Sequence, residues 1–210
     1  QQGAGRVILV EHGPDGGPAL FERARAVVLA TRPSQVRTAL AEAEAARAAG
    51  AWVAGYVAYE AGYALEPRLA RLMPRRRSGP LVALGIYDAP GDAAPALARA
   101  AEAGRTTVMT EPRPLIGRRA YGNAARKVLG YVAAGDCYQV NLTFPMAARL
   151  VHGSALGLYG AFRRTGAVGH GAYVDLGVGP VVVSRSPELF FQVTADGRIQ
   201  ARPMKGTRPR

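Results

Sequence analysis

Short extended runs outnumber the helical segments of this chain, and that balance limits the folds that it can adopt. The predicted strands are residues 6–10, 51–59, 81–87, 172–176 and 180–184. Short connections join most of these runs, and short connections favour antiparallel pairing. We therefore expect an α+β fold of two stacked antiparallel sheets with peripheral helices.

Three helices are predicted, and each ends at a glycine that suits a helix C-terminus. They are residues 34–49 before Gly50, 117–134 before Gly135 and 154–165 before Gly166. The segment 89–105 is rich in proline, alanine and glycine, and is expected to be an irregular surface segment. A chain of 210 residues can build one substantial core, so we expect a single domain over residues 1–210.

Two predicted strands differ in what their faces carry. In residues 51–59 both faces are apolar, which predicts a strand buried between two layers. In a strand that follows the cap at Gly135, Cys137, Gln139 and Asn141 share one face. The two amides either bond to backbone groups in the core or line a substrate cavity or effector pocket.

A hairpin is predicted around Asp196-Gly197, between an apolar run at 189–194 and a second extended run at 198–202. If Asp196 and Gly197 alone form the loop, counting outward places Glu188 opposite Lys205. Opposed side chains share a face, with β-carbons about 5 Å apart. The pair is either an ordinary ion pair or a carboxylate that accepts the lysine's proton.

Lys205 lies among arginines, directly before Gly206-Thr207. A lysine amine has a reference pKa of about 10.4, so it needs a lowered pKa to act as a nucleophile at pH 7. Burial and nearby Arg202, Arg208 and Arg210 would lower it. The alternative is a basic surface tail.

Four blocks of sequence, in order, resemble the chorismate-utilising enzymes, and among them the aminodeoxychorismate synthases (component I). They are Gly55-Tyr56-Val57-Ala58-Tyr59-Glu60, the segment from Tyr121 to Leu142, Ser186-Pro187-Glu188, and Pro203-Met204-Lys205-Gly206-Thr207-Arg208-Pro209-Arg210. The resemblance implies two stacked antiparallel sheets with peripheral helices, incomplete in this chain. It also implies that residues 1–210 are the N-terminal part of a longer chorismate-utilising domain.

The resemblance implies roles for individual residues. Lys205 would attack C2 of chorismate as the C4 hydroxyl departs, and ammonia would then add at C4 to give 4-amino-4-deoxychorismate for para-aminobenzoate and folate synthesis. Glu188 falls on the family's second catalytic position, and Gly206 and Thr207 on substrate-binding positions. Related anthranilate synthases typically carry alanine where this chain has Lys205. An anthranilate synthase component I, or another chorismate enzyme, is the alternative.

The resemblance further implies a Mg²⁺ cofactor whose ligands lie in a C-terminal half, so that no metal ligand is expected in this chain. It implies a glutamine amidotransferase subunit as ammonia donor, and an aminodeoxychorismate lyase that is either fused or separate. The 210-residue chain alone is therefore expected to show no turnover. The stretch around His170 lacks the Asn-Pro segment that tryptophan-binding relatives use, so bound tryptophan is not expected.

The cysteine content indicates a cellular location, and the net charge raises a second class of function, a non-catalytic binding protein. Cys137 is the single cysteine, so no internal disulfide can form, and we expect a cytoplasmic protein. No apolar run is long enough to span a membrane. The net charge of +12, with Arg75-Arg76-Arg77 in a predicted loop, raises the alternative of a non-catalytic, arginine-rich binding fragment. No zinc-finger or helix-turn-helix pattern accompanies that charge, so nucleic acid is not an expected partner.

Overall fold

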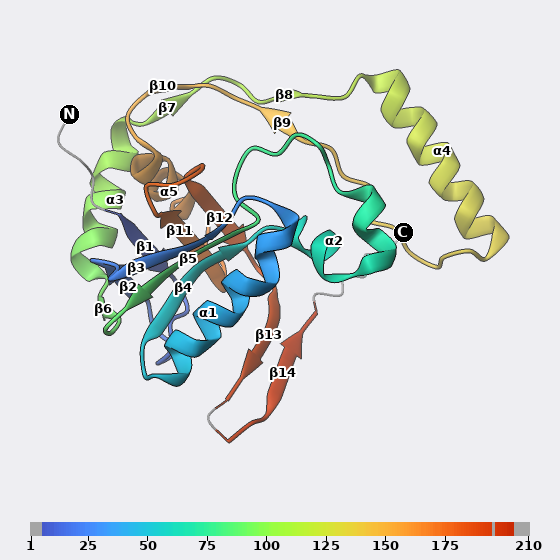
Figure 1. The fold of residues 1–210 in the computed structure, drawn as a ribbon. Helices are drawn as coiled ribbons and strands as arrows, with labels where there is room; N and C mark the ends of the chain where they lie inside the picture. Colours follow the sequence, from blue (N-terminus) through green and yellow to red (C-terminus); the bar gives the residue numbers. More distant parts are fainter. Residues whose placement is uncertain (1–5, 195, 204–210) are drawn as a thin grey trace.

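The computed structural model describes residues 6–194 and 196–203. Its larger sheet is antiparallel, with five strands in the order β12-β11-β1-β2-β6 (Figure 1). These strands are β1 (Val7–Val10), β2 (Ala19–Glu22), β6 (Gly91–Asp92), β11 (His170–Asp175) and β12 (Val182–Ser186). The smaller antiparallel sheet has the order β3-β5-β4, from β3 (Ala26–Ala30), β5 (Val82–Tyr87) and β4 (Trp52–Val57).

The central strand β1 shows how the core is divided. Successive side chains of a strand point to opposite faces of its sheet. Ile8 packs in a cluster that also contains Phe21 and, from the smaller sheet, Tyr87. Leu9 packs in a second cluster with Tyr159 and with residues of α3. One strand therefore contributes to two separate apolar clusters, each with a face of the larger sheet as its wall.

Helices cover the outer faces of both sheets. Helices α3 (Ala94–Thr106) and α5 (Ala155–Arg163) pack together on the larger sheet, and glycines let their backbones approach closely, since a β-carbon on Gly160 would overlap the carbonyl oxygen of Ala100. On the smaller sheet lie the 3₁₀ turn η1 (Pro33–Gln35) and helices α1 (Val36–Ala48) and α2 (Ala61–Leu65), followed by η2 (Pro67–Leu72).

Helix α4 (Arg118–Ala134) stands apart from this body (Figure 1). Two short ladders lead to it: β7 (Val108–Met109) pairs with β10 (Leu150–His152), and β8 (Arg113–Pro114) pairs with β9 (Met146–Ala147). None of its residues is buried, and Leu129 is 66% exposed. The structure thus presents an amphipathic helix whose apolar side is only partly covered by the residues described: the Tyr121 ring packs on Phe144, whereas Leu129 faces solvent.

Several predictions from the sequence are confirmed. The fold is a mixture of helices and several antiparallel sheets. The helices that begin near Ser34, Gly117 and Ser154 are present as α1, α4 and α5. Gly135 ends α4 in the left-handed region with φ 81°, and the amide of Asp136 donates to the carbonyl of Tyr131 across the cap.

Three predictions are wrong. β4 is an edge strand, with Trp52 39% and Val57 48% exposed, because only β5 pairs with it. The segment expected to be irregular, 89–105, contains α3, whose Ala96, Ala100 and Gly104 are buried at helical spacing. Residues 137–142 form no strand, because no neighbouring strand pairs with them within the described chain.

Tyr87→Phe is expected to raise the free energy of unfolding by about 1 kcal/mol. The Tyr87 side chain is fully buried, and its hydroxyl has no hydrogen-bond partner among the described residues, so its desolvation is uncompensated. Burial also raises the pKa of Tyr87 to about 12.

The unfolded chain therefore releases this proton first, and the wild type loses stability as pH rises from about 10 through the folded pKa. Urea unfolding at pH 8 and pH 11 should show that the advantage of Tyr87→Phe grows at the higher pH. Tyr59→Phe, at a side chain that is 84% exposed, is the control, and it should leave the free energy of unfolding unchanged at both pH values. A Tyr87→Phe variant less stable than wild type at pH 8 would contradict the expectation.

Candidate functional site

The corner Ser186-Pro187-Glu188 joins the larger sheet to the hairpin of β13 (Leu189–Val193) and β14 (Ile199–Arg202). The Ser186 hydroxyl accepts a hydrogen bond from the Glu188 amide (3.2 Å) and donates one to the Glu188 carbonyl (3.1 Å). These local bonds fix the backbone conformation of the short connection between β12 and β13. The Glu188 side chain is exposed at this corner, next to the first residue of β13.

An open pocket of about 490 Å³ lies beside this corner. Its lining residues come from both strands of the hairpin and from the corner: Ser186, Glu188, Leu189, Phe190, Ala201 and Pro203. Leu189, Phe190, Ala201 and Pro203 make the wall of the pocket largely apolar, and the Phe190 ring is 86% exposed. Glu188 is the one carboxylate among the lining residues. A pocket with a single acid beside an aromatic surface suits a small organic substrate whose protons that acid can exchange.

The hairpin itself is confirmed, but the counted register is wrong. Val193 pairs with Ile199 and Leu189 pairs with Arg202, so the described pairs do not continue to a match of Glu188 with Lys205. The loop is longer than Asp196-Gly197, because the Thr194 amide donates to the Arg198 carbonyl and Gly197 has φ 79°. A three-residue loop that ends in a left-handed glycine is a common hairpin connection.

A second shift follows further along the strands. The register changes between Leu189 and Gln192, which marks a bulge in β13. Glu188 and Pro203, which flank the pair of Leu189 and Arg202, both line the same pocket. Lys205, Gly206 and Thr207, the other predicted site residues, lie outside the described residues.

Glu11 is the centre of a partly buried network that fixes β12 directly before the corner. Its carboxylate, 11% exposed, accepts from Arg185 Nη1 at 2.8 Å, from Arg163 Nε at 3.0 Å and from the Tyr159 hydroxyl at 3.0 Å. Burial, and then the Glu11 charge, raises the pKa of Tyr159 well above its usual value. The network ties the end of β1 to α5 and β12, and Arg185 precedes Ser186 by one residue.

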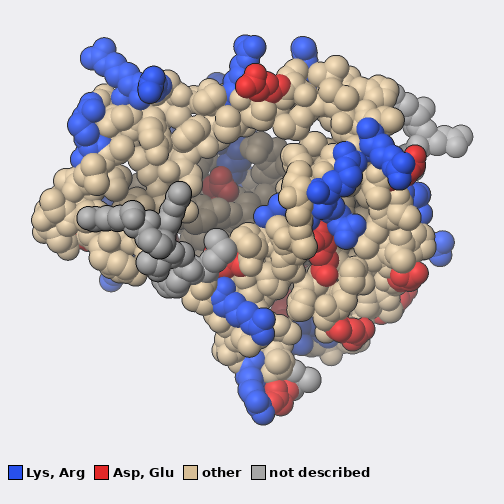
Figure 2. Space-filling view, turned by 180° about the vertical axis from the view of Figure 1, so that it is seen from behind, with Lys and Arg blue, Asp and Glu red and all other residues tan. Residues whose placement is uncertain are grey.

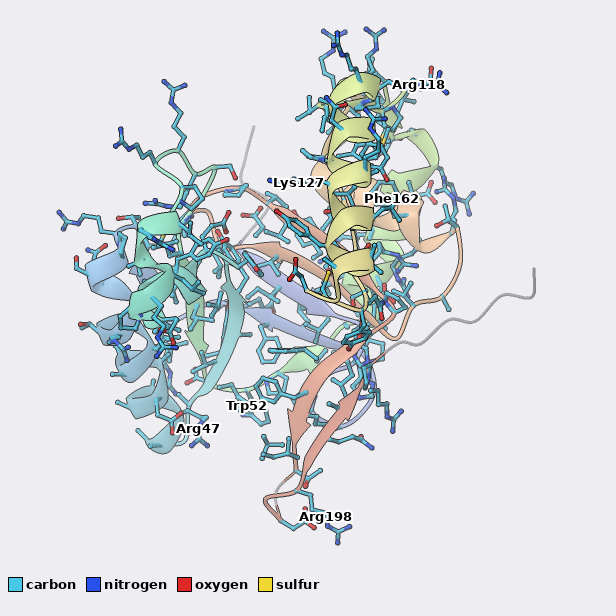
Figure 3. The ribbon with its side chains drawn as sticks, turned by 90° about the vertical axis from the view of Figure 1, so that its right-hand side faces the viewer. Arg47, Trp52, Arg118, Lys127, Phe162 and Arg198 are labelled. Atoms are coloured by element: carbon cyan, nitrogen blue, oxygen red, sulfur yellow. The ribbon has the colours of Figure 1, made fainter. Side chains whose placement is uncertain are left out.

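A larger pocket, of about 770 Å³, lies between the two sheets and the hairpin. Trp52 of β4 and Phe191 of β13 both line it, and Figure 3 shows Trp52 on the side of its sheet that faces the hairpin. At its polar end the rings of His12 and His170 meet edge to face, with centroids 5.3 Å apart. The pocket adjoins the same hairpin that carries the corner.

The polar residues after α4 do not contribute to either pocket. Gln139 and Asn141 are exposed, and Cys137 is partly exposed rather than in the core. Neither of the two expected uses of these amides is realised among the described residues, because the segment lies beside α4 and away from the sheets (Figure 1).

Residues 6–194 and 196–203 contain neither a cluster of metal ligands nor a helix that could span a membrane. No group of three or more His, Cys, Asp or Glu side chains there could hold a metal ion. No helix in the same residues has both the length and the apolarity to cross a membrane. On the face in Figure 2, Lys and Arg side chains are scattered over several regions rather than gathered in one patch.

Reasoning from sequence missed Glu11 and Arg185 as parts of the site. A carboxylate directly after a buried strand was the available signal for Glu11, but its partners lie more than 140 residues away. For Arg185 the signal was its position in a strand interior, directly before Ser186-Pro187-Glu188. An arginine at such a position needs a partner.

The family model of the chorismate binding enzyme matches residues 17–210. An aminodeoxychorismate synthase component 1 from Klebsiella aerogenes is 36% identical over 104 residues, which are 50% of this chain and 22% of that protein. An anthranilate synthase component 1 from Thermus thermophilus is 43% identical over 95 residues, 44% of this chain and 20% of that protein. An aminodeoxychorismate synthase from Streptomyces griseus is 39% identical over 79 residues, 38% of this chain and 11% of that protein.

The matched segment thus spans about a fifth or less of each of these relatives. No solved structure matches the chain.

Proposed function

Because the chain belongs to the chorismate binding enzyme family, we propose that the full-length protein is an aminodeoxychorismate synthase component I. It would be a transaminase-type transferase that converts chorismate and ammonia to 4-amino-4-deoxychorismate, for para-aminobenzoate and folate synthesis. The observation that carries this choice is Lys205 before Gly206-Thr207, where related anthranilate synthases typically have alanine.

The proposed chemistry proceeds in two displacements. The Lys205 amine forms a bond to C2, the ring double bonds shift, and the C4 hydroxyl leaves as water after it takes up a proton. Ammonia then bonds to C4, the double bonds shift back, and the bond from C2 to the lysine breaks. Dividing one substitution into two steps replaces a high barrier with two lower ones.

Glu188 is the group proposed to move protons in both steps. It lines the same pocket as Pro203, which precedes the proposed nucleophile Lys205 by two residues in the sequence. The network around Glu11 supports this role indirectly, because it fixes Arg185 next to the corner that carries Glu188. Gly206 and Thr207 are proposed to contact the substrate.

A Mg²⁺ cofactor is proposed for the full-length enzyme, with ligands expected outside this chain. Bound magnesium would balance the charge of the substrate's carboxylates. A glutamine amidotransferase subunit is proposed as the source of ammonia, and a fused or separate aminodeoxychorismate lyase as the next enzyme. With Cys137 as the one cysteine, a cytoplasmic location is proposed.

Residues 1–210 are proposed to be the N-terminal part of a longer domain of two stacked antiparallel sheets with peripheral helices. The uncovered apolar surface supports this: Phe190 is 86%, Ile199 76% and Leu129 66% exposed. Large apolar side chains exposed on the hairpin and on α4 are surfaces that further chain could cover. The 210-residue chain alone, supplied with chorismate, ammonia and magnesium, is expected to form no aminodeoxychorismate.

Anthranilate synthase is the second candidate, and the 43% identity to the Thermus thermophilus enzyme favours it. Product analysis separates the two. The full-length protein is incubated with chorismate, an ammonium salt and Mg²⁺, and the products are resolved by chromatography with mass detection. We expect 4-amino-4-deoxychorismate; anthranilate as the main product would overturn the proposed function while leaving the family assignment intact.

A further inference from the structure

A basic groove lies on the side of the smaller sheet, away from the corner at Glu188. Its volume is about 640 Å³, and it is lined by Leu29, Thr31, Arg75, Arg76, Arg77, Ser78, Gly79, Pro80, Val178 and Gly179. Three arginines and two hydroxyl side chains thus border one groove, and no acidic residue is among its lining residues. It shares no lining residue with the pocket of Glu188.

The floor of the groove is held rigidly by two Gly-Pro pairs that cross each other. A β-carbon on Gly79 would lie 2.7 Å from Pro180 Cδ, and one on Gly179 would lie 2.5 Å from Pro80 Cδ. Gly179 also has φ 70°, which favours glycine. Gly79-Pro80, which closely follows the arginines in the chain, therefore packs against the turn between β11 and β12.

The arginines divide into one that is structural and two that are available. Arg77 donates from Nη1 to the Pro74 carbonyl at 2.7 Å and from Nη2 to the Thr31 carbonyl at 3.0 Å, which fixes the shape of the loop. Arg75 and Arg76 are exposed and have no ion pair within residues 6–194 and 196–203. Their guanidinium groups keep their donors for a ligand.

We propose that this groove binds a small ligand through a phosphate group. A guanidinium presents a planar fork of donors that matches the oxygens of a phosphate, and two such forks with nearby hydroxyls suit a doubly charged group. The absence of a lining carboxylate leaves the positive charge uncompensated. The proposal is independent of the proposed function, because none of these residues belongs to the site at Glu188.

The test uses the full-length protein and inorganic phosphate as the probe, with ionic strength held constant by sodium chloride. Binding is measured by calorimetry for the wild type, for the double variant Arg75→Gln/Arg76→Gln, and for the matched control Arg68→Gln/Arg71→Gln. The control removes the same charge from η2, which is adjacent in sequence but does not line the groove.

We expect saturable binding by the wild type, a loss of affinity of about tenfold or more in the groove variant, and little change in the control. A third variant, Arg75→Lys/Arg76→Lys, keeps the charge but lacks the planar pairs of guanidinium donors, so it should also bind phosphate more weakly than the wild type. Equal losses in the groove variant and the control would mean an adventitious ion only, and would overturn the proposal. So would phosphate binding no tighter than chloride in the wild type.

Discussion

Lys205→Ala in the full-length protein is expected to lower the rate of aminodeoxychorismate formation by about a thousandfold or more. Alanine removes the proposed nucleophile, and without a bond to C2 the ammonia must displace the C4 hydroxyl in one step. The rate is measured with an ammonium salt as donor, so that a defect in ammonia transfer from a partner cannot imitate the result.

The chain provides its own matched control for this variant. Lys127 is the only other lysine of the sequence, and it lies on α4 with its ammonium 5.7 Å from the centre of the Tyr131 ring. Lys127→Ala should leave the rate close to that of the wild type. An unchanged rate in Lys205→Ala would count decisively against the covalent role, whereas equal losses in both variants would indicate a general effect of charge.

Glu11→Ala is expected to lower the free energy of unfolding by about 3 kcal/mol, the second large effect. The substitution removes the carboxylate that Arg185, Arg163 and Tyr159 share, and it leaves two arginines close together without their counter-ion. Removing one member of a buried ion pair costs about 3–5 kcal/mol, and the 32% exposure of Arg163 places this case at the lower end.

Urea unfolding measures this loss, with Glu44→Ala as the comparison. Glu44 also pairs with an arginine, Arg47, but both side chains are more than 60% exposed. Water screens such a pair, so its removal should change stability little. If Glu11→Ala costs no more than Glu44→Ala, the network does not support the fold. If stability falls but product formation in the folded protein is unchanged, it does not position the corner.

What the sequence predicted well is what depends on neighbouring residues. Gly135 ends α4 because its backbone can enter the left-handed region, and that requirement is visible in the sequence. Ser154 begins α5 by accepting from the amide of Gly157, which is an equally local interaction. Both predictions needed no knowledge of distant parts of the chain.

What failed depends on partners far away. The alanines of α3 give a weak apolar pattern, and their burial arises because α3 packs against both α5 and the larger sheet. The two apolar faces of β4 predicted burial between layers, yet its position at the edge of the sheet exposes Trp52.

The candidate site shows the same division. The hairpin of β13 and β14 was predicted from the sequence, since local turn chemistry at Asp196-Gly197 indicates it. The predicted register is wrong by one residue at the loop, which is longer than Asp196-Gly197, and by one more at the bulge between Leu189 and Gln192. The ion network around Glu11 joins the end of β1 to α5 and β12, and no local sequence pattern indicates it.

The position of β1 has a consequence for how the chain is made. β1 lies in the middle of its sheet, and Val7 pairs with Asp175, so one of its two neighbours is synthesised long after it. The pairing with β2 can form early, but the β11 edge of β1 stays unpaired until residues 170–175 have left the ribosome. Such long-range pairing is slow to form, and an open strand edge invites aggregation. We therefore expect nascent chains that end before residue 170 to need protection by a chaperone.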